Sequence, residues 1–240
     1  MSRTPKVIAG ATVFAVLIGA AALSVGGPAV AAGTETAGTS FVEVVDNPYF
    51  PLPVGRTLVY KGVRDGQTQT DRVRVTHRTK VIQGVTCIVV HDVARHGSRL
   101  LEKTTDWYAQ DTQGNVWYFG EATAEYDRHG HVASREGSWR AGVDGAVRGV
   151  IMPATPHVPD GYRQEFYPGH AEDAAWVLSR GGSLTVPFGT VHRVLRSMEW
   201  TRLEPDVVAT KAYAPGLGIV LERTLAGGDE VAKLVRVLSA

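Results

Sequence analysis

Apolar and polar residues alternate along most of the chain beyond residue 45. The pattern is clear at 57–63 and again at 71–77, and the turn-forming pair Asp65-Gly66 lies between these two segments. A period of two places successive side chains on opposite faces of a strand, and an Asp-Gly pair favours a tight hairpin. This part of the chain is therefore predicted to form antiparallel strands with one face buried and the other in water.

Similar strand-like segments continue to the C-terminus, separated by glycine, proline and other turn residues. They lie at 81–82, 85–90, 100–108, 115–119, 162–167, 183–186, 191–200, 207–214, 219–225 and 231–238. Short strands at this spacing are typical of an antiparallel sandwich or barrel. We predict an all-β fold with a single antiparallel, strongly curved sheet, in the form of a half-barrel, a barrel or a sandwich, and with at most one short helix.

Two segments depart from the alternating pattern. Residues 170–178 carry acidic residues early and apolar residues late, which is the best helical pattern in the chain. Residues 137–161 are rich in glycine and proline and predict a long covering loop. Such a loop is consistent with a functional lid or wall, and equally with an insert that only covers a sheet edge.

The first 32 residues have the three parts of a secretory signal peptide. A basic start with Arg3 and Lys6 precedes an apolar run from Val7 to Val25, and the small residues at 30–32 suit a signal peptidase. The alternative is a retained membrane anchor, because the run is long enough to span a bilayer. We expect cleavage, hence a secreted protein without a stable membrane anchor.

The rest of the chain divides into a predicted flexible leader at 33–44 and a single β domain at 45–240. Loss of Arg3 and Lys6 with the signal peptide changes the net charge from +1 to −1, and the remaining chain has no basic stripe. Nucleic acid is therefore not an expected partner. The single cysteine, Cys87, lies in an apolar run and is expected to be a buried, unreactive thiol.

Several segments of the chain resemble a loose group of uncharacterised exported bacterial β-proteins. Leu58 and Phe188 depart from the group pattern, which has Trp and Ala at these positions. The segments that carry the resemblance are NPYFPLPVG (47–55), DWYAQD (106–111), GNVWYFGE (114–121), VPFGT (186–190) and YAPGLGIV (213–220). The resemblance implies an exported antiparallel β-fold with a strongly curved sheet, like those of periplasmic lipid-carrier proteins. It implies no reaction.

Motifs for covalent or metal-dependent catalysis are absent from the sequence. It contains no G-x-S-x-G elbow, no S-x-x-K and no H-E-x-x-H among its eight histidines. The pair His129 and His131 is more consistent with an exposed turn than with a metal site. We expect no metal and no cofactor.

Aromatic residues on a predicted hairpin give the strongest binding signal. With a loop at 110–114, strand alternation places aromatic side chains on both faces of this hairpin. One face would be core, and the other would line a cavity or meet the long loop. The alternative is a core on both faces. The predicted ligand-binding residues are Trp107, Tyr108, Trp117, Tyr118, Trp139, Arg163 and Tyr167.

Three functional hypotheses follow from these patterns. The first is a secreted protein that binds an apolar or amphipathic small molecule in a concave, aromatic-lined face. The second is an enzyme of cyclase or isomerase type that uses the same pocket, with Glu121, Asp144 and Glu165 as candidate carboxyl groups. A glycosidase-like pairing of carboxyl groups, such as Glu165 with Glu172, belongs to this class. The third is a structural or interaction module of the cell envelope.

Overall fold

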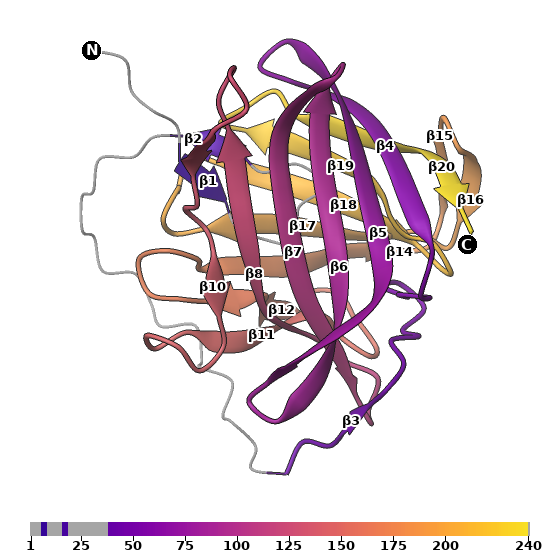
Figure 1. Cartoon of the computed structure of the whole chain (residues 1–240). Coiled ribbons are helices and arrows are strands. Elements are labelled where there is room, and N and C mark those ends of the chain that lie inside the picture. Colours follow the sequence, from indigo (N-terminus) through magenta and orange to yellow (C-terminus); the bar gives the residue numbers. More distant parts are fainter. Residues whose placement is uncertain (1–5, 9–15, 19–37, 240) are drawn as a thin grey trace.

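The computed structural model describes residues 6–8, 16–18 and 38–239, and in these ranges every regular element is a strand (Figure 1). Sixteen strands belong to one sheet, and every recorded strand pairing is antiparallel. The sheet curves round on itself until its two ends nearly meet. The prediction of an all-β fold with one strongly curved antiparallel sheet is confirmed.

The front wall in Figure 1 consists of long consecutive strands. Its members are β4 (Thr57–Arg64), β5 (Gln67–Ile82), β6 (Val85–His96), β7 (Arg99–Asp111) and β8 (Val116–Tyr126). Asp65 and Gly66 join β4 to β5 with positive φ angles of 49° and 70°, as a tight hairpin turn with two left-handed residues requires. The sequence signal at this turn is confirmed.

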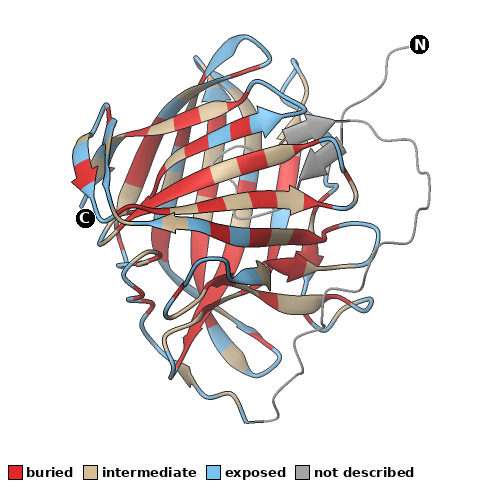
Figure 2. Ribbon diagram, turned by 180° about the vertical axis from the view of Figure 1, so that it is seen from behind, coloured by how far each residue is buried: buried red, intermediate tan, exposed pale blue. Residues whose placement is uncertain are grey.

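The back wall is built from the C-terminal part of the chain (Figure 2). It contains β14 (Asp173–Arg180), β17 (Leu195–Thr201), β18 (Val208–Ala214), β19 (Gly218–Ala226) and β20 (Val231–Leu238). Strand β20 pairs with β4 and so joins the two walls along one side. A separate hairpin is formed by β15 (Ser183–Val186) and β16 (Gly189–His192), so the predicted strand at 191–200 is split in two.

Residues 137–161 form less of a loop than the sequence predicts. They contain β10 (Trp139–Arg140) and β11 (Val147–Met152), both of which pair with β8. The preceding β9 (Val132–Ser134) also pairs with β8. The two ends of the sheet are β12 (Gly161–Arg163) and β13 (Glu165–Phe166), which are separated in the chain by Gln164 alone.

The helical pattern at 170–178 does not produce a helix, because most of this segment belongs to β14. Pairing with both β12 and β17 satisfies its backbone groups. Its burial alternates, with Asp173, Ala175 and Val177 facing the interior. Helical propensity is a weak preference that sheet pairing readily overrides.

The predicted signal peptide lies largely outside the described residues. Its described parts are β1 (Lys6–Ile8) and β2 (Val16–Ile18), which pair with each other. The predicted leader ends in β3 (Phe41–Val42), which pairs with β7, so the sheet begins before residue 45. No helix long and apolar enough to cross a membrane occurs among the residues that the structure describes.

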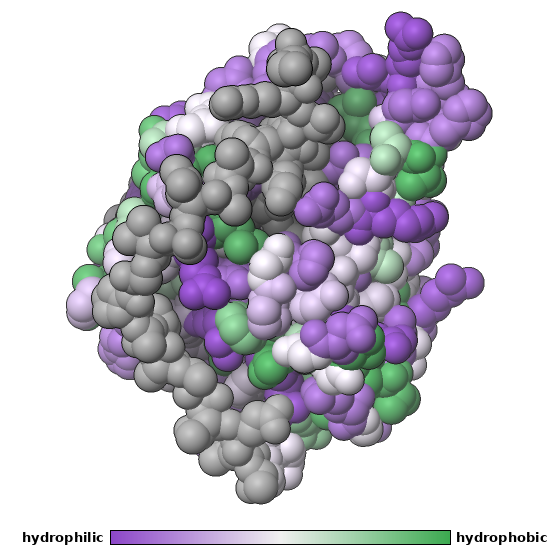
Figure 3. Space-filling model, turned by 90° about the vertical axis from the view of Figure 1, so that its left-hand side faces the viewer, coloured by the Kyte–Doolittle hydropathy of each residue, from purple (hydrophilic) through white to green (hydrophobic). Residues whose placement is uncertain are grey.

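Aromatic and aliphatic side chains are buried on both faces of the front wall. Tyr108 and Tyr118 are buried on the inner face, whereas Trp107, Phe119 and Cys87 are buried on the outer face. Burial raises the pKa of the Cys87 thiol to about 12, so this cysteine is an unreactive core residue as predicted. On the described part of the surface in Figure 3, hydrophilic and hydrophobic residues are interspersed.

Candidate functional site

Among the carboxyl groups on the inner face of the front wall, four lie one on each of four neighbouring strands. They belong to Asp71 on β5, Asp92 on β6, Asp106 on β7 and Glu121 on β8, and all four residues are buried. Residues opposite each other in an antiparallel pair point to the same face. Asp106 is opposite Glu121, so the register alone brings these two acids together.

Below these acids, the same inner face becomes aromatic. Tyr108 is opposite Tyr118, and their rings stack with centroids 4.8 Å apart. Phe50 packs edge-on against Tyr108 at 5.2 Å, and Trp139 packs edge-on against Tyr118 at 5.3 Å. The front wall therefore presents two bands to the interior. We call Asp71, Asp92, Asp106 and Glu121 the acidic band, and Tyr108 and Tyr118 the aromatic band.

A segment between β3 and β4 crosses one end of the barrel. We call residues 43–56 the strap. Asn47 fastens it to the β7–β8 side, because its side-chain amide donates to the backbone oxygens of Gly114 at 2.9 Å and Pro153 at 3.1 Å. On the other side, the amide of Gly216 in the β18–β19 turn donates to the carbonyl of Pro48 at 2.8 Å. The strap thus closes this end of the barrel.

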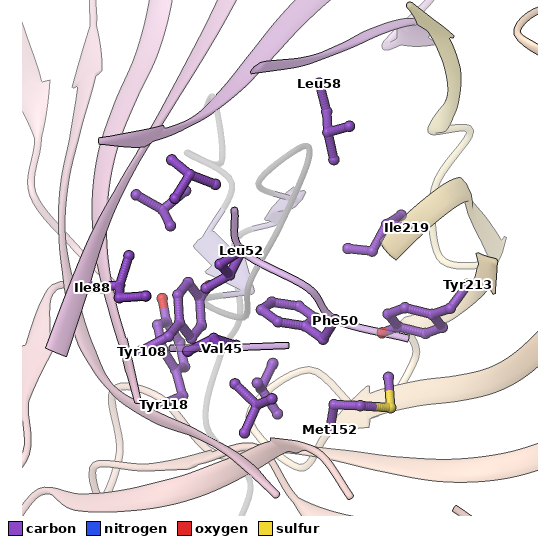
Figure 4. Close-up of a cluster of buried hydrophobic side chains, with 14 of the residues drawn as sticks. Val45, Phe50, Leu52, Leu58, Ile88, Tyr108, Tyr118, Met152, Tyr213 and Ile219 are labelled. Carbon is purple, nitrogen blue, oxygen red and sulfur yellow. The ribbon is translucent and has the colours of Figure 1, made fainter. Parts of the chain in front are cut away.

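Three strap side chains, Val45, Phe50 and Leu52, enter the core (Figure 4). In the close-up, Phe50 lies between Tyr108 on one wall and Tyr213 and Ile219 on the other. Strap and walls line a partly open cavity of about 50 Å³. At about 15 Å³ per water position, this is space for roughly three water molecules.

The cavity has apolar walls and two acids at its margin. The residues that line it include Phe50, Leu52, Leu58, Tyr60, Val73, Val90, Tyr108 and Ile219, with the carboxyl residues Asp92 and Asp106. Arg56 also lines the cavity, and its guanidinium donates to the backbone oxygens of Pro51, Gly216 and Leu217. Apolar walls with a few polar groups are typical of small-molecule sites.

The hydroxyl of Tyr118 bridges two carboxyl groups. It lies 2.8 Å from Oδ1 of Asp106 and 2.7 Å from Oε2 of Glu121. A phenol has one proton to donate. Both contacts are hydrogen bonds only if one of the two carboxyl groups is protonated and donates to the hydroxyl.

Burial favours this protonated form. Desolvation raises the pKa of Asp106 to about 7, against an ordinary value near 4, and the hydrogen bond from Tyr118 only partly opposes it. Desolvation also raises the pKa of Glu121 well above its usual range, with a further contribution from the charge of Asp106. The pair therefore holds an exchangeable proton near neutral pH.

The predicted ligand-binding residues separate into three places. Tyr108 lines the cavity, and Tyr118 and Trp139 lie directly behind it through ring contacts. Trp107 and Trp117 are on the outer face instead, where Lys80 Nζ lies 3.6 Å from the Trp107 ring and Trp117 Nε1 donates to Asp111 at 2.8 Å. The hairpin thus has aromatic residues on both faces, as its alternation predicts.

Arg163 and Tyr167 lie at the seam between the ends of the sheet. The Arg163 guanidinium lies 4.2 Å from the centre of the Phe166 ring. Tyr167 stacks on His170 with ring centroids 4.3 Å apart. Neither residue is among those that line the cavity.

The three predicted carboxyl candidates have different surroundings. Glu121 belongs to the inner acidic band, as described above. Glu165 is fully buried and accepts a hydrogen bond of 2.5 Å from Trp139 Nε1. Asp144 is exposed in a turn, where its φ is 51°. Glu172, suggested as a partner of Glu165, is instead bonded to Arg202.

Sequence analysis assigned no role to Asp71 or Asp92. Both occupy positions that alternation assigns to the inner face, in step with Val73 and Val90. The sequence signal that would have identified them is an acidic residue at a strand position that alternation assigns to the buried face. Among the described residues, no group of three or more His, Cys, Asp or Glu side chains has the geometry of a metal site.

No protein-family model matches the chain, and no curated protein matches its sequence. One solved structure with a similar fold is a protein from Bacteroides fragilis described as exported and as having a YmcC-like fold. Its TM-score is 0.46 at 14% identity, and the match covers 80% of this chain and 99% of that chain. Another is described as a lipoprotein, from Parabacteroides distasonis, with a TM-score of 0.40, 11% identity and coverage of 84% and 100%. The similarity extends to the fold alone.

Proposed function

We propose that this protein is a secreted binding protein that holds an amphipathic small molecule inside its barrel. The observation that supports the proposal is the partly open cavity between strap and walls, which combines apolar and aromatic walls with the carboxyl groups of Asp92 and Asp106. An interior that served only for packing would not require acids at a cavity margin, because each buried carboxyl group costs free energy. The polar margin would orient the ligand, and the apolar walls would supply affinity.

The strap sets the size of what can bind. A cavity of about 50 Å³ is smaller than the roughly 150 Å³ that admits a benzene ring. A larger ligand must therefore displace Phe50 and Leu52, the strap side chains that fill the space between the walls. Hydrogen bonds from Asn47 hold the strap closed, so their rupture is the expected opening step.

A dye titration with a cavity-filling variant tests the proposal. We expect Nile red, a neutral apolar dye, to bind saturably with a rise in emission. Val90→Phe places a larger side chain in the cavity lining and should weaken binding at least tenfold. Val132→Phe is the matched control on the exposed strand β9, and it should leave the dissociation constant unchanged.

Circular dichroism would first show that both variants fold. Absence of saturable dye binding to the wild-type protein would contradict the proposal. Equal binding by Val90→Phe and wild type would do the same, since the dye would then bind elsewhere.

A second candidate function, acid–base catalysis in the same cavity, is supported by Asp106. Its pKa of about 7 suits a group that donates and accepts protons at neutral pH. Mass spectrometry of a ligand recovered after incubation with the protein would detect its conversion into a product. Under this alternative, Asp106→Asn abolishes conversion while the ligand still binds. A ligand recovered unchanged from the wild-type protein argues for binding alone.

A further inference from the structure

The acidic band of the front wall has no matching positive charge. Within residues 38–239, no Lys, Arg or His nitrogen lies within 4.0 Å of a carboxyl oxygen of Asp71, Asp92, Asp106 or Glu121. Buried carboxyl groups in proteins are ordinarily paired with a cation or bound to a metal. This interior therefore has an excess of acid that its own side chains do not neutralise.

The buried basic groups nearby are already engaged. Arg64 pairs with Glu230 at 2.8 Å, and Lys211 on the back wall pairs with Glu199 at 2.6 Å. A third basic group, the half-buried Arg56, donates to backbone oxygens at the strap end of the cavity. None of the three forms an ion pair with the acidic band.

Asp71 adds to this excess of acid. It is fully buried, and the side chain that interacts with its carboxyl group is that of another acid, Asp92, not that of a cation. Asp92 lines the cavity, whereas Asp71 is not among the residues that line it. Two interacting buried acids without a cation are costly, and a positively charged ligand in contact with Asp92 would lower that cost.

The aromatic residues next to these acids favour the same kind of ligand. Tyr60 and Tyr108 both line the cavity with Asp92 and Asp106, and Phe50 packs against Tyr108. Aromatic faces attract ammonium groups, most strongly where water is excluded. Carboxyl groups and aromatic rings together form the surroundings in which an organic cation is stabilised.

From this arrangement we propose that the cavity selects ligands with a positively charged head group, of the alkylammonium class. The ammonium group lies against Asp92 and Asp106, with Tyr60 and Tyr108 beside it, and the alkyl chain extends along the apolar wall towards Phe50 and Ile219. The inference deepens the proposed function and rests on it, because it names the ligand class of the same cavity.

Cation binding in this cavity is coupled to proton release. Burial raises the pKa of Asp106 to about 7, and a bound ammonium group favours its charged form. Affinity for the cation should therefore rise between pH 6 and pH 8. The other titratable groups that face Asp92 and Asp106 are Tyr60 on β4, Asp71 on β5, Glu102 and Tyr108 on β7, Tyr118 and Glu121 on β8, Glu222 on β19 and, at the strap end, Arg56.

Three ligands with the same alkyl chain test the proposal by calorimetry: octylammonium, 1-octanol and octanoate. At pH 8 we expect octylammonium to bind at least tenfold more tightly than octanol, and octanoate to bind most weakly. At pH 5.5 the preference for the cation should fall severalfold. Calorimetry in two buffers with different ionisation enthalpies should show net proton release with octylammonium.

Asparagine variants locate the origin of the preference. Asp92→Asn and Asp106→Asn should each lower the ratio of octylammonium to octanol affinity, whereas Asp144→Asn, at an exposed turn, should leave this ratio unchanged. Equal affinity for all three ligands would overturn the inference and leave the proposed function intact. Binding of none of them, together with no Nile red binding, would overturn both.

Discussion

Tyr118 connects the two bands of the inner wall. Its ring stacks on Tyr108 in the aromatic band, and its hydroxyl contacts Asp106 and Glu121 in the acidic band. The residue is completely buried, so water does not replace these contacts when they are lost. A single hydroxyl group therefore connects Asp106 and Glu121.

Replacement of that hydroxyl should be costly. Tyr118→Phe leaves two buried carboxyl groups without the hydroxyl that is hydrogen-bonded to both, and we expect a loss of about 1–3 kcal/mol in the free energy of unfolding. Urea denaturation at pH 6 measures it. Tyr49→Phe is the matched control, since the Tyr49 hydroxyl donates to the backbone oxygen of Arg193 at an exposed site. An equal loss in both variants would show that the buried hydroxyl has no special role.

Among the elements, the short strand β10 depends on a glycine in its neighbour β8. Gly120 is opposite Arg140 and has a φ of +126°. A Cβ atom at this position would lie 2.3 Å from the backbone oxygen of Trp139. The absence of a side chain thus lets β10 approach, and β10 in turn places Trp139 against Tyr118.

Gly120→Ala should separate β10 from β8. We expect a loss of about 3 kcal/mol or more in unfolding free energy, because backbone strain and a backbone clash add together. The near-ultraviolet circular dichroism of the buried Trp139 should weaken as well. Gly130 also has a positive φ, of 81°, but open space lies around the position of a new Cβ, so Gly130→Ala measures backbone strain without a clash, about 1 kcal/mol. Equal losses in the two variants would exclude the clash.

The long elements were predictable, and the short ones were not. Alternation at 57–63 and 71–77 predicts β4 and part of β5, because one face of each strand is buried along its length. Residues 139–140 are too short to show a period, and the helical pattern at 170–178 yields to pairing with β12 and β17. For the site, alternation indicates two aromatic faces, but not which one is internal. The irregularity between Asp106 and Tyr108, which sets their partners on β8, lies at Gly120, and a glycine inside a strand is a signal of such a bulge that the alternation alone does not use.

At the scale of the whole molecule, the interior is asymmetric in charge. The front wall contributes the acidic band, whereas the back wall contributes the ion pair between Lys211 and Glu199. Burial raises the pKa of Asp71, like that of Asp106, to about 7. The folded barrel therefore binds protons that the unfolded chain, with aspartate pKa values near 3.9, releases.

Stability should consequently fall as the pH rises. At pH values between about 4 and 7, the folded state binds more protons than the unfolded state. The contribution of these two groups to the unfolding free energy is therefore largest below about pH 4 and decreases up to about pH 7. Each such group contributes about 2 kcal/mol of change between pH 5 and pH 7. Urea titrations at these two values measure the slope. Asp106→Asn should reduce the slope, and a stability that rises over this interval would contradict the prediction.

The burial of Cys87 has a practical consequence for work on this barrel. Its thiol is buried on the outer face of the front wall, and its pKa of about 12 leaves almost no thiolate at neutral pH. An alkylating reagent can therefore reach it only after the structure around it opens. Because the chain contains no other cysteine, the rate at which the thiol is alkylated reports how often the native protein opens, and no engineered probe is needed.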